Sequence, residues 1–305
     1  MKIKLFTHTD LDGVGCAVVA SVVFGDLIDV EYCSYDNVNL KVSEFLESTE
    51  SETFDIIFIT DISVNKQVAD ELNSCDKRVY LLDHHSNLEW LNDYEWAFVA
   101  IEYDGRLQSG CNLFYDKLLA IDLMPAVDLG ALAQFVEAVR RYDTYDWTRL
   151  PDSQMSKDLL DILGVIGRDE FVECYVEQIR LMASNRLDFR MPQEHALLLV
   201  YFRRKNEAYI ESKLNETKII IDEFGNRCAF VVSSDIAVIS EIGNAMCNQF
   251  ECDYAAVYHG TGISLRSVGS FDVSHIAEAY GGGGRCNTAG MPAALEYLEK
   301  YIGVV

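Results

Sequence analysis

RVYLLDHH, residues 78–85, is an apolar, β-type run that ends directly in an acid and two histidines. Two earlier stretches have the same form, LFTHTDLDG (5–13) and FITDIS (58–63), and longer helical patterns separate the three. Strands that alternate with helices are typical of a parallel sheet covered on both faces. The sequence therefore predicts an α/β fold for the N-terminal part of the chain.

The expected strands place polar side chains at one edge of this sheet. We expect strands at 3–7, 28–33, 55–60 and 78–82, and helices at 13–24, 40–47 and 65–73. The carboxyl ends of parallel strands lie along one edge, where open α/β sheets bind their ligands. We therefore expect the following residues to converge there, the last of them after a helical stretch at 128–140: Asp10, Asp12, Asp61, His84, His85 and Asp143.

The rest of the chain divides into a helical connector and a second domain. Residues 151–215 contain no convincing strand, and 172–182 and 194–213 have helical spacing. The pattern then turns mixed, with strands expected near 218–222, 227–233, 254–259 and 262–267 and helices at 237–249, 273–280 and 291–301. We predict a parallel-sheet domain at 1–150, a helical connector at 151–215 and a smaller mixed α/β domain at 216–305.

The charge of the chain limits its partners. Among 305 residues, 25 are Lys or Arg and 49 are Asp or Glu, a formal net charge of −24. Such a protein repels long polyanions, which disfavours high-affinity binding of duplex nucleic acid. Short phosphorylated substrates remain compatible with this charge where metal ions and a few arginines create a local positive site.

The apolar runs and the cysteines indicate the compartment. No apolar run approaches the ~18 residues that a membrane span needs, so no membrane association is expected. The nine cysteines are scattered and form no CxxC pair. A disulfide framework or zinc knuckle is therefore not expected, and a reducing cytoplasm fits best.

The strand-end acids point to a pair of metal ions. Four carboxylates brought together, including Asp143, repel unless cations neutralise them or some become protonated. Taken singly, Asp10 and Asp12 are explained by capping a helix at Gly13, and Asp61 by capping one near residue 63. Taken together, they favour two divalent cations, Mn²⁺ in preference to Mg²⁺ or Co²⁺, with Asp61 bridging them. Two such ions ~3.5–4 Å apart activate water and stabilise phosphoryl transfer.

These motifs resemble the DHH phosphoesterase superfamily, whose name is spelled by residues 83–85. HTDLDG (8–13), TDIS (60–63) and Asp143 match its other motifs, and HTDLDGVGC is most similar to the NrnB-type oligoribonuclease branch. SLRSVGSFDVSHIAEAYGGGGRCNTAG (264–290) is similar to the DHH-associated substrate-binding domain, with its run of four glycines. The resemblance covers nearly the whole chain.

The resemblance implies roles for the residues at the sheet edge. Asp10 and Asp12 would bind separate ions bridged by Asp61, while His84 and Asp143 would complete the ligand set. His85 would lie beside the scissile phosphate as a substrate ligand or proton donor, so His85 and Asp61 are the expected catalytic residues. The family often opens with His-x-Asn-x-Asp-x-Asp. Here Phe6 stands at the His position and His8 at the Asn position, and His8 is the expected ligand.

The second domain offers candidates for phosphate binding. Glycines let backbone amides approach an anion, and Arg266 and Arg285 supply positive charge. The family usually has His where Arg285 stands, which keeps the cation but loses the imidazole. A flexible turn with a surface arginine is the alternative interpretation. The expected substrate ligands are Arg266, Gly282, Gly283, Gly284 and Arg285.

The resulting expectation is a metal-dependent phosphodiesterase that hydrolyses short oligoribonucleotides to mononucleotides through a metal-activated hydroxide. The alternatives are hydrolysis of cyclic or linear dinucleotides, hydrolysis of pyrophosphate, and a catalytically silent nucleotide-binding protein. Phe6 and Arg285 favour the silent protein, and the complete acid set opposes it. A homodimer through the sheet edge or the connector helices is compatible with the sequence.

Overall fold

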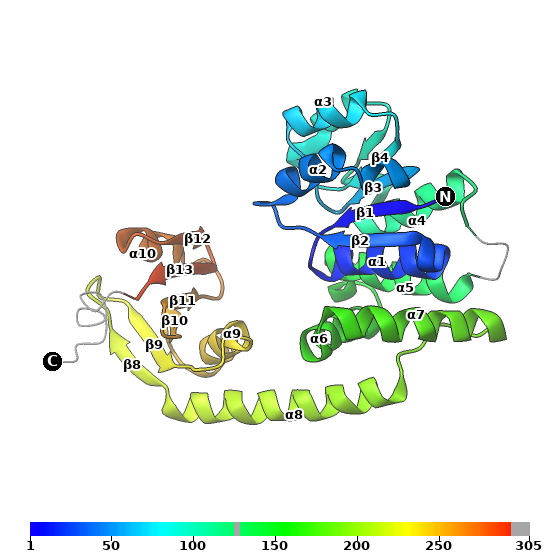
Figure 1. Cartoon of the computed structure of the whole chain (residues 1–305). Coiled ribbons are helices and arrows are strands. Elements are labelled where there is room, and N and C mark those ends of the chain that lie inside the picture. The colour runs from blue at the N-terminus through cyan, green and yellow to red at the C-terminus, as the bar shows by residue number, and fades with distance from the viewer. Residues whose placement is uncertain (125–128, 294–305) are drawn as a thin grey trace. The chain divides into compact units, whose positions relative to one another are not determined.

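The computed structural model describes residues 1–124 and 129–293 (Figure 1). The chain forms two compact units, Met1–Leu199 and Val200–Val305. Helix α8 (Gln193–Glu216) begins in the first unit and ends in the second. Among the described residues, no helix is both long and apolar enough to cross a membrane.

The first unit contains a five-stranded sheet whose neighbouring strands all pair in parallel. The strand order is β2-β1-β3-β4-β5. The α/β class is confirmed, and β5 is a strand that the sequence interpretation missed. The bounds are β1 (Ile3–Thr7), β2 (Ile28–Tyr32), β3 (Ile56–Thr60), β4 (Arg78–Asp83) and β5 (Ala97–Val99).

Helices cover both faces of this sheet (Figure 1). Every residue of β1 and β3 is buried, as is typical of central strands in a parallel sheet, and the buried Lys4 of β1 forms an ion pair with Asp29. Leu5 and Phe58 pack in the core under the first group of helices, whereas Ile57 and Ile59 pack in the core under the second. The first group is α1 (Leu11–Phe24), α4 (Gly110–Ala120), α5 (Gly130–Asp143) and α7 (Arg168–Asn185); the second is α2 (Val38–Glu47) and α3 (Lys66–Ser74).

The strand order reverses between two central strands, β1 and β3. The chain leaves β1 toward β2 on one side and later continues through β3 toward β4 on the other. Ligands of open α/β sheets bind where the order reverses in this way, outside the carboxyl ends of the strands. Asp10 follows β1 and Asp61 follows β3, so the two acids flank that position.

The region expected as a connector forms helices only. α6 (Gln154–Ile166) and α7 pack against α5 and α1 of the first unit, and α8 follows them. The remaining small elements of this unit are a two-stranded ribbon and short 3₁₀ helices. Their bounds are β6 (Glu102–Tyr103), β7 (Arg106–Leu107), η1 (Gly25–Leu27), η2 (Ser51–Thr53), η3 (Ser86–Asp93) and η4 (Asp146–Thr148).

The second unit contains a six-stranded mixed sheet of order β12-β13-β11-β10-β9-β8. Only β9 and β10 pair in parallel, and the other pairs are antiparallel. The mixed α/β class expected for this region is confirmed. The bounds are β8 (Lys218–Ile221), β9 (Arg227–Val232), β10 (Tyr254–Tyr258), β11 (Gly262–Arg266), β12 (Gly283–Arg285), β13 (Thr288–Pro292), α9 (Ile239–Gln249) and α10 (Ser274–Ala279).

The four-glycine stretch differs from expectation because part of it is a strand. A Cβ at Gly282 would lie 2.1 Å from the Gly290 oxygen, and one at Gly284 would lie 2.4 Å from the Ala289 Cα. These glycines are therefore needed for close strand pairing. The helix expected at 291–301 is wrong at its start, since 291 and 292 belong to β13, and 294–301 lie outside the described residues.

Candidate active site

Seven polar side chains lie together at the carboxyl edge of the parallel sheet. They come from the loop between β1 and α1, from the first turn of α1, from the residues that follow β3 and β4, and from the last residue of α5. Potential ligand atoms lie within 4.8 Å of one another in two separate triads: His8, Asp10 and Asp61, and Asp12, His84 and Asp143. The seventh residue, His85, groups with Asp61 and His84.

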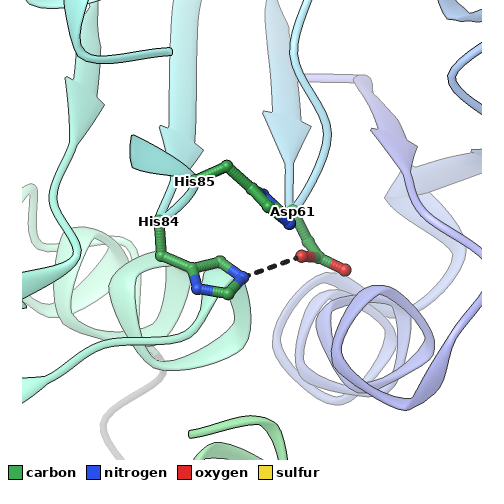
Figure 2. A group of neighbouring side chains, drawn as sticks. All are labelled: Asp61, His84 and His85. Atoms are coloured by element: carbon green, nitrogen blue, oxygen red, sulfur yellow. Dashed lines mark ion pairs between the residues drawn. The ribbon is translucent and has the colours of Figure 1, made fainter. Parts of the chain in front are cut away.

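Asp61 belongs to the first triad and also lies close to the second. Its Oδ2 is 3.8 Å from His8 Nδ1, and its Oδ1 is 3.4 Å from His84 Nε2 (Figure 2). His84 Nε2 also lies 3.4 Å from Asp143 Oδ2 and 3.8 Å from Asp12 Oδ2. Each oxygen of the Asp61 carboxylate thus faces a different triad, which is the arrangement that a bridging ligand requires.

His8 and Asp10 form the outer part of the first triad. His8 Nδ1 lies 2.9 Å from Asp10 Oδ2, while Asp10 Oδ1 accepts a hydrogen bond from the Gly13 amide and caps α1. The capping interpretation of Asp10 therefore holds for one oxygen, and the other faces His8. Phe6, at the position where the family often has His, is fully buried in the core and packs against Phe45.

Asp12 is oriented by the first turn of α4. Its two oxygens accept hydrogen bonds from the backbone amides of Gly110, at 2.5 Å, and Cys111, at 3.0 Å. Ser109 and Asn112 cap this helix reciprocally and so hold its N-terminus in place. The free amides and the helix dipole favour a negative carboxylate at this position.

Gly110 also contacts Asp61 directly. A Cβ at residue 110 would lie 2.5 Å from the Asp61 Cβ, 2.8 Å from its Cα and 2.9 Å from its backbone nitrogen. Asp61 itself has a φ of 56°, in the left-handed region, which Asp and Asn tolerate better than most residues. The sequence interpretation missed α4 entirely, although Ser109 and Asn112 form a capping pattern and Cys111, Phe114 and Leu118 have helical spacing.

His85 is held by a buried carboxylate. Its Nδ1 lies 2.7 Å from Asp83 Oδ1, and Asp83 also accepts hydrogen bonds from Ser63 and from the His84 amide. Nε2 of His85 lies 3.4 Å from the Tyr35 hydroxyl. The roles of Asp83 and Tyr35 were missed, although Tyr35 follows β2 at the same sheet edge.

The last turn of α5 is anchored by a buried arginine. Arg140 forms ion pairs with Glu137 and Asp146, both at 2.9 Å, and donates a hydrogen bond to the Leu107 oxygen. These contacts tie the end of α5, which carries Asp143, to the segment that precedes α4.

Burial and mutual repulsion shift the pKa values of the acids. Burial and the charges of Asp12 and Asp10 raise the pKa of Asp61 well above its usual range and that of Asp143 to about 8. Burial also raises the pKa of Asp12. Burial opposes ionisation of Asp10 as well, but the neighbouring His8 imidazole holds its pKa at about 2. Without cations, the four acids are not all ionised at neutral pH.

The donor set fits divalent cations. Asp61 Oδ2 and His84 Nε2 are buried and have no hydrogen-bond partner, and the buried His8 Nδ1 faces only the Asp10 carboxylate, at 2.9 Å. Buried polar atoms in native proteins are normally paired, so unpaired donors and acceptors grouped in this way indicate a ligand. Carboxylate oxygens combined with imidazole nitrogens suit ions such as Mn²⁺. The site therefore fits two cations, one at each triad.

The candidate phosphate ligands lie in the second unit. Arg266 in β11 and Arg285 in β12 both pair with Thr288 of β13, so the three residues form one row across the sheet. Directly opposite residues of antiparallel strands project to the same face. Arg266 donates hydrogen bonds to the Ser240 hydroxyl and the Leu265 oxygen, and no salt bridge to it occurs in the described part of the chain.

No protein-family model matches the sequence. Oligoribonuclease NrnB of Bacillus subtilis (strain 168) is 35% identical over 308 residues, covering 98% of this chain and 74% of the relative. The chain belongs to the oligoribonuclease NrnB family. The superfamily and branch predicted from residues 8–16 and 83–85 are thereby confirmed.

Solved structures share the fold of this NrnB-family chain at low identity. Exonuclease RecJ bound to manganese has a TM-score of 0.57 and 12% identity, covering 99% of this chain and 88% of RecJ. The DHH domain of a member of the s1p family of ribosomal proteins has a TM-score of 0.55 and 14% identity, and the match covers 99% of this chain and 86% of that domain's chain. The pGpG-specific phosphodiesterase PggH from Vibrio cholerae has a TM-score of 0.54 and 13% identity, and the match covers 98% of this chain and 95% of PggH. The fold is thus that of DHH-domain proteins.

We expect the metal-free form of this NrnB-family protein to lose stability as the pH rises from about 4 to about 8. Folded Asp143 keeps its proton up to about pH 8, whereas an unfolded Asp ionises near pH 4. The stabilisation is complete below the unfolded pKa and is lost as pH rises through the folded one. Each pH unit within this window costs about 1.4 kcal/mol of stability.

Urea denaturation in the presence of a chelator measures this effect. Mn²⁺ should abolish the pH dependence, and Asp143→Asn should reduce it. Stability that rises over the same pH range would contradict the expectation.

Proposed function

We propose that this protein is a divalent-metal-dependent phosphodiesterase that hydrolyses short oligoribonucleotides to mononucleotides. The observation that carries the proposal is the position of Asp61, whose two carboxylate oxygens face two ligand triads. Membership of the oligoribonuclease NrnB family supports the substrate class.

Each triad would hold one cation. His8 and Asp10 would bind the first cation. The second cation would be bound by Asp12, His84 and Asp143, and Asp61 would bridge the two cations. Each triad contains one imidazole, which favours Mn²⁺ over Mg²⁺, with Co²⁺ also compatible. When bound, the two ions activate a water molecule and neutralise charge that develops on the phosphate.

His85 would act on the substrate. Asp83 accepts a hydrogen bond from His85 Nδ1–H, which leaves Nε2 as the nitrogen available to the phosphate. The Asp83 carboxylate raises the pKa of His85 and so favours the imidazolium, which carries a proton on each ring nitrogen. As the P–O bond to the leaving nucleotide breaks, the Nε2 proton of this imidazolium would pass to the departing oxygen. Tyr35 borders this nitrogen and limits its orientation.

The second unit would bind the substrate's terminal phosphate. Arg266 and Arg285 flank Thr288 in one row, and Gly282, Gly283 and Gly284 lead into that row. In this proposal, residues 1–150 form the catalytic domain and residues 151–215 form the helical connector. Residues 216–305 form the domain that recognises the nucleotide end of the substrate. The net charge of −24 favours short substrates, because a long strand needs an electropositive path.

Hydrolysis of end-labelled RNAs, from dinucleotides to about twenty-mers, tests the proposal. With Mn²⁺ we expect rapid mononucleotide release from the shortest RNAs only, and none after chelation or in His84→Gln. A cyclic dinucleotide and pyrophosphate are assayed in parallel. Turnover of the cyclic dinucleotide alone would replace the proposal with second-messenger hydrolysis. Nucleotide binding without any turnover would leave a silent binding protein.

A further inference from the structure

A second group of potential metal ligands lies away from the active site, on helices α7 and α8. Glu170 and Cys174 are one turn apart on α7, and His195 lies in the first turn of α8. One ligand atom from each of the three residues lies within 4.8 Å of the other two. None of the seven active-site residues belongs to these helices.

His195 is a buried imidazole with an unpaired nitrogen. Its side chain is packed beside the ring of Tyr175 and the residue is only 5% exposed, yet Nδ1 has no hydrogen-bond partner. Buried polar atoms without partners are uncommon in native proteins, and an imidazole nitrogen is the most frequent protein ligand of metal ions. The unpaired nitrogen therefore indicates a ligand at this position.

The surroundings of the thiol favour a cation. Partial burial and the carboxylates of Glu170, Glu173, Glu177 and Glu194 raise the pKa of Cys174. A divalent cation would reverse this effect, because it neutralises the carboxylates and stabilises the thiolate. Glu170 is exposed and Cys174 half-buried, so an ion has access from solvent.

We propose that Glu170, Cys174 and His195 bind one zinc-type transition-metal ion, with a water molecule as the fourth ligand. Thiolate, imidazole and carboxylate are the ligands that Zn²⁺ takes in tetrahedral sites, whereas Mg²⁺ and Mn²⁺ prefer oxygen-rich sites. Cys174 releases its proton to solvent when the metal–sulfur bond forms. The ion joins α7 to the start of α8, the helix that leads into the second unit.

Cobalt titration tests this site independently of the proposed hydrolytic function. The reduced, chelator-treated protein is first given excess Mg²⁺ and then titrated with Co²⁺. Neither active-site triad contains a thiol, so a thiolate-to-cobalt charge-transfer band reports on cysteine ligation alone. We expect the band to saturate at one equivalent of Co²⁺, and added Zn²⁺ to displace it.

Variants assign the band to these residues. Cys174→Ser should abolish it, and Glu170→Gln should weaken Co²⁺ binding at least about tenfold. Cys75→Ser is the matched control, because Cys75 is another half-buried cysteine of the first unit, and the band should persist. Glu170 is exposed, so Glu170→Gln remains informative if Cys174→Ser fails to fold, and its RNA hydrolysis with Mn²⁺ should stay unchanged. The proposal is overturned if the wild type shows no band, or if the band survives both Cys174→Ser and Glu170→Gln.

Discussion

Asp61→Asn is expected to reduce hydrolysis of short RNA by at least about 10³-fold without unfolding the protein. The substitution removes the charge of the one carboxylate that faces both triads. Loss of a single transition-state-stabilising group costs ~10²–10³ in rate, and this residue serves two proposed cations. Asn tolerates the left-handed backbone that Asp61 adopts, so the loop keeps its conformation.

The stability of the same variant separates this explanation from general damage. Asp10 and Asp12 repel the buried Asp61 charge, and Asn carries no charge. The metal-free variant should therefore unfold at a temperature no lower than that of the wild type near pH 8. Asp104→Asn is the matched control, since Asp104 also has a left-handed backbone but is exposed in the turn between β6 and β7. Activity of Asp61→Asn within about tenfold of the wild type would disprove the bridging role.

The strands and their ends could be predicted from the sequence because the relevant signals are local. Short, mostly apolar runs such as Ile56–Thr60 are typical of strands buried inside a parallel sheet. Once the strands are parallel, the residues that follow them must share an edge. The convergence of Asp10, Asp61 and His84 therefore depends only on strand direction.

The groups that orient these ligands could not be predicted, because they come from distant parts of the chain. Asp12 is held by backbone amides that lie 98 and 99 residues later in the chain, at the start of α4. Tyr35 approaches His85 through tertiary packing alone. Backbone amides carry no residue identity, so a single sequence does not reveal them as partners.

The glycine stretch shows how one composition supports two explanations. Residues 281–284 were expected to provide backbone amides for a phosphate. In the structure, Gly282 and Gly284 leave room for β13, while an added Cβ at Gly283 would meet nothing within 4 Å. Strand packing thus accounts for two of these glycines, and only Gly283 and Gly281 retain open space next to Arg285.

Gly110→Ala is expected to reduce hydrolysis at least about 10²-fold, although residue 110 contributes no side chain to the site. The new Cβ would lie 2.5 Å from the Asp61 Cβ and 2.8 Å from its Cα, atoms that cannot rotate away. The first turn of α4 must therefore move and withdraw the amides that hold Asp12. A displacement of about 1 Å in a catalytic constellation costs ~10²-fold, and overpacking costs about 1–3 kcal/mol of stability.

The measurement is kcat/KM for a short RNA, together with Mn²⁺ affinity and thermal unfolding of the same protein. Gly164→Ala is the control, because a Cβ at this position of α6 meets nothing within 4 Å, and the change should preserve activity and slightly raise stability. Assayed well below its unfolding temperature, Gly110→Ala should lose more activity than its unfolded fraction explains. Activity within about threefold of the wild type would show that α4 does not position the acids. The expected loss of at least about 10²-fold would show that the geometry of both triads depends on Gly110, as it does on Asp61 and Asp12.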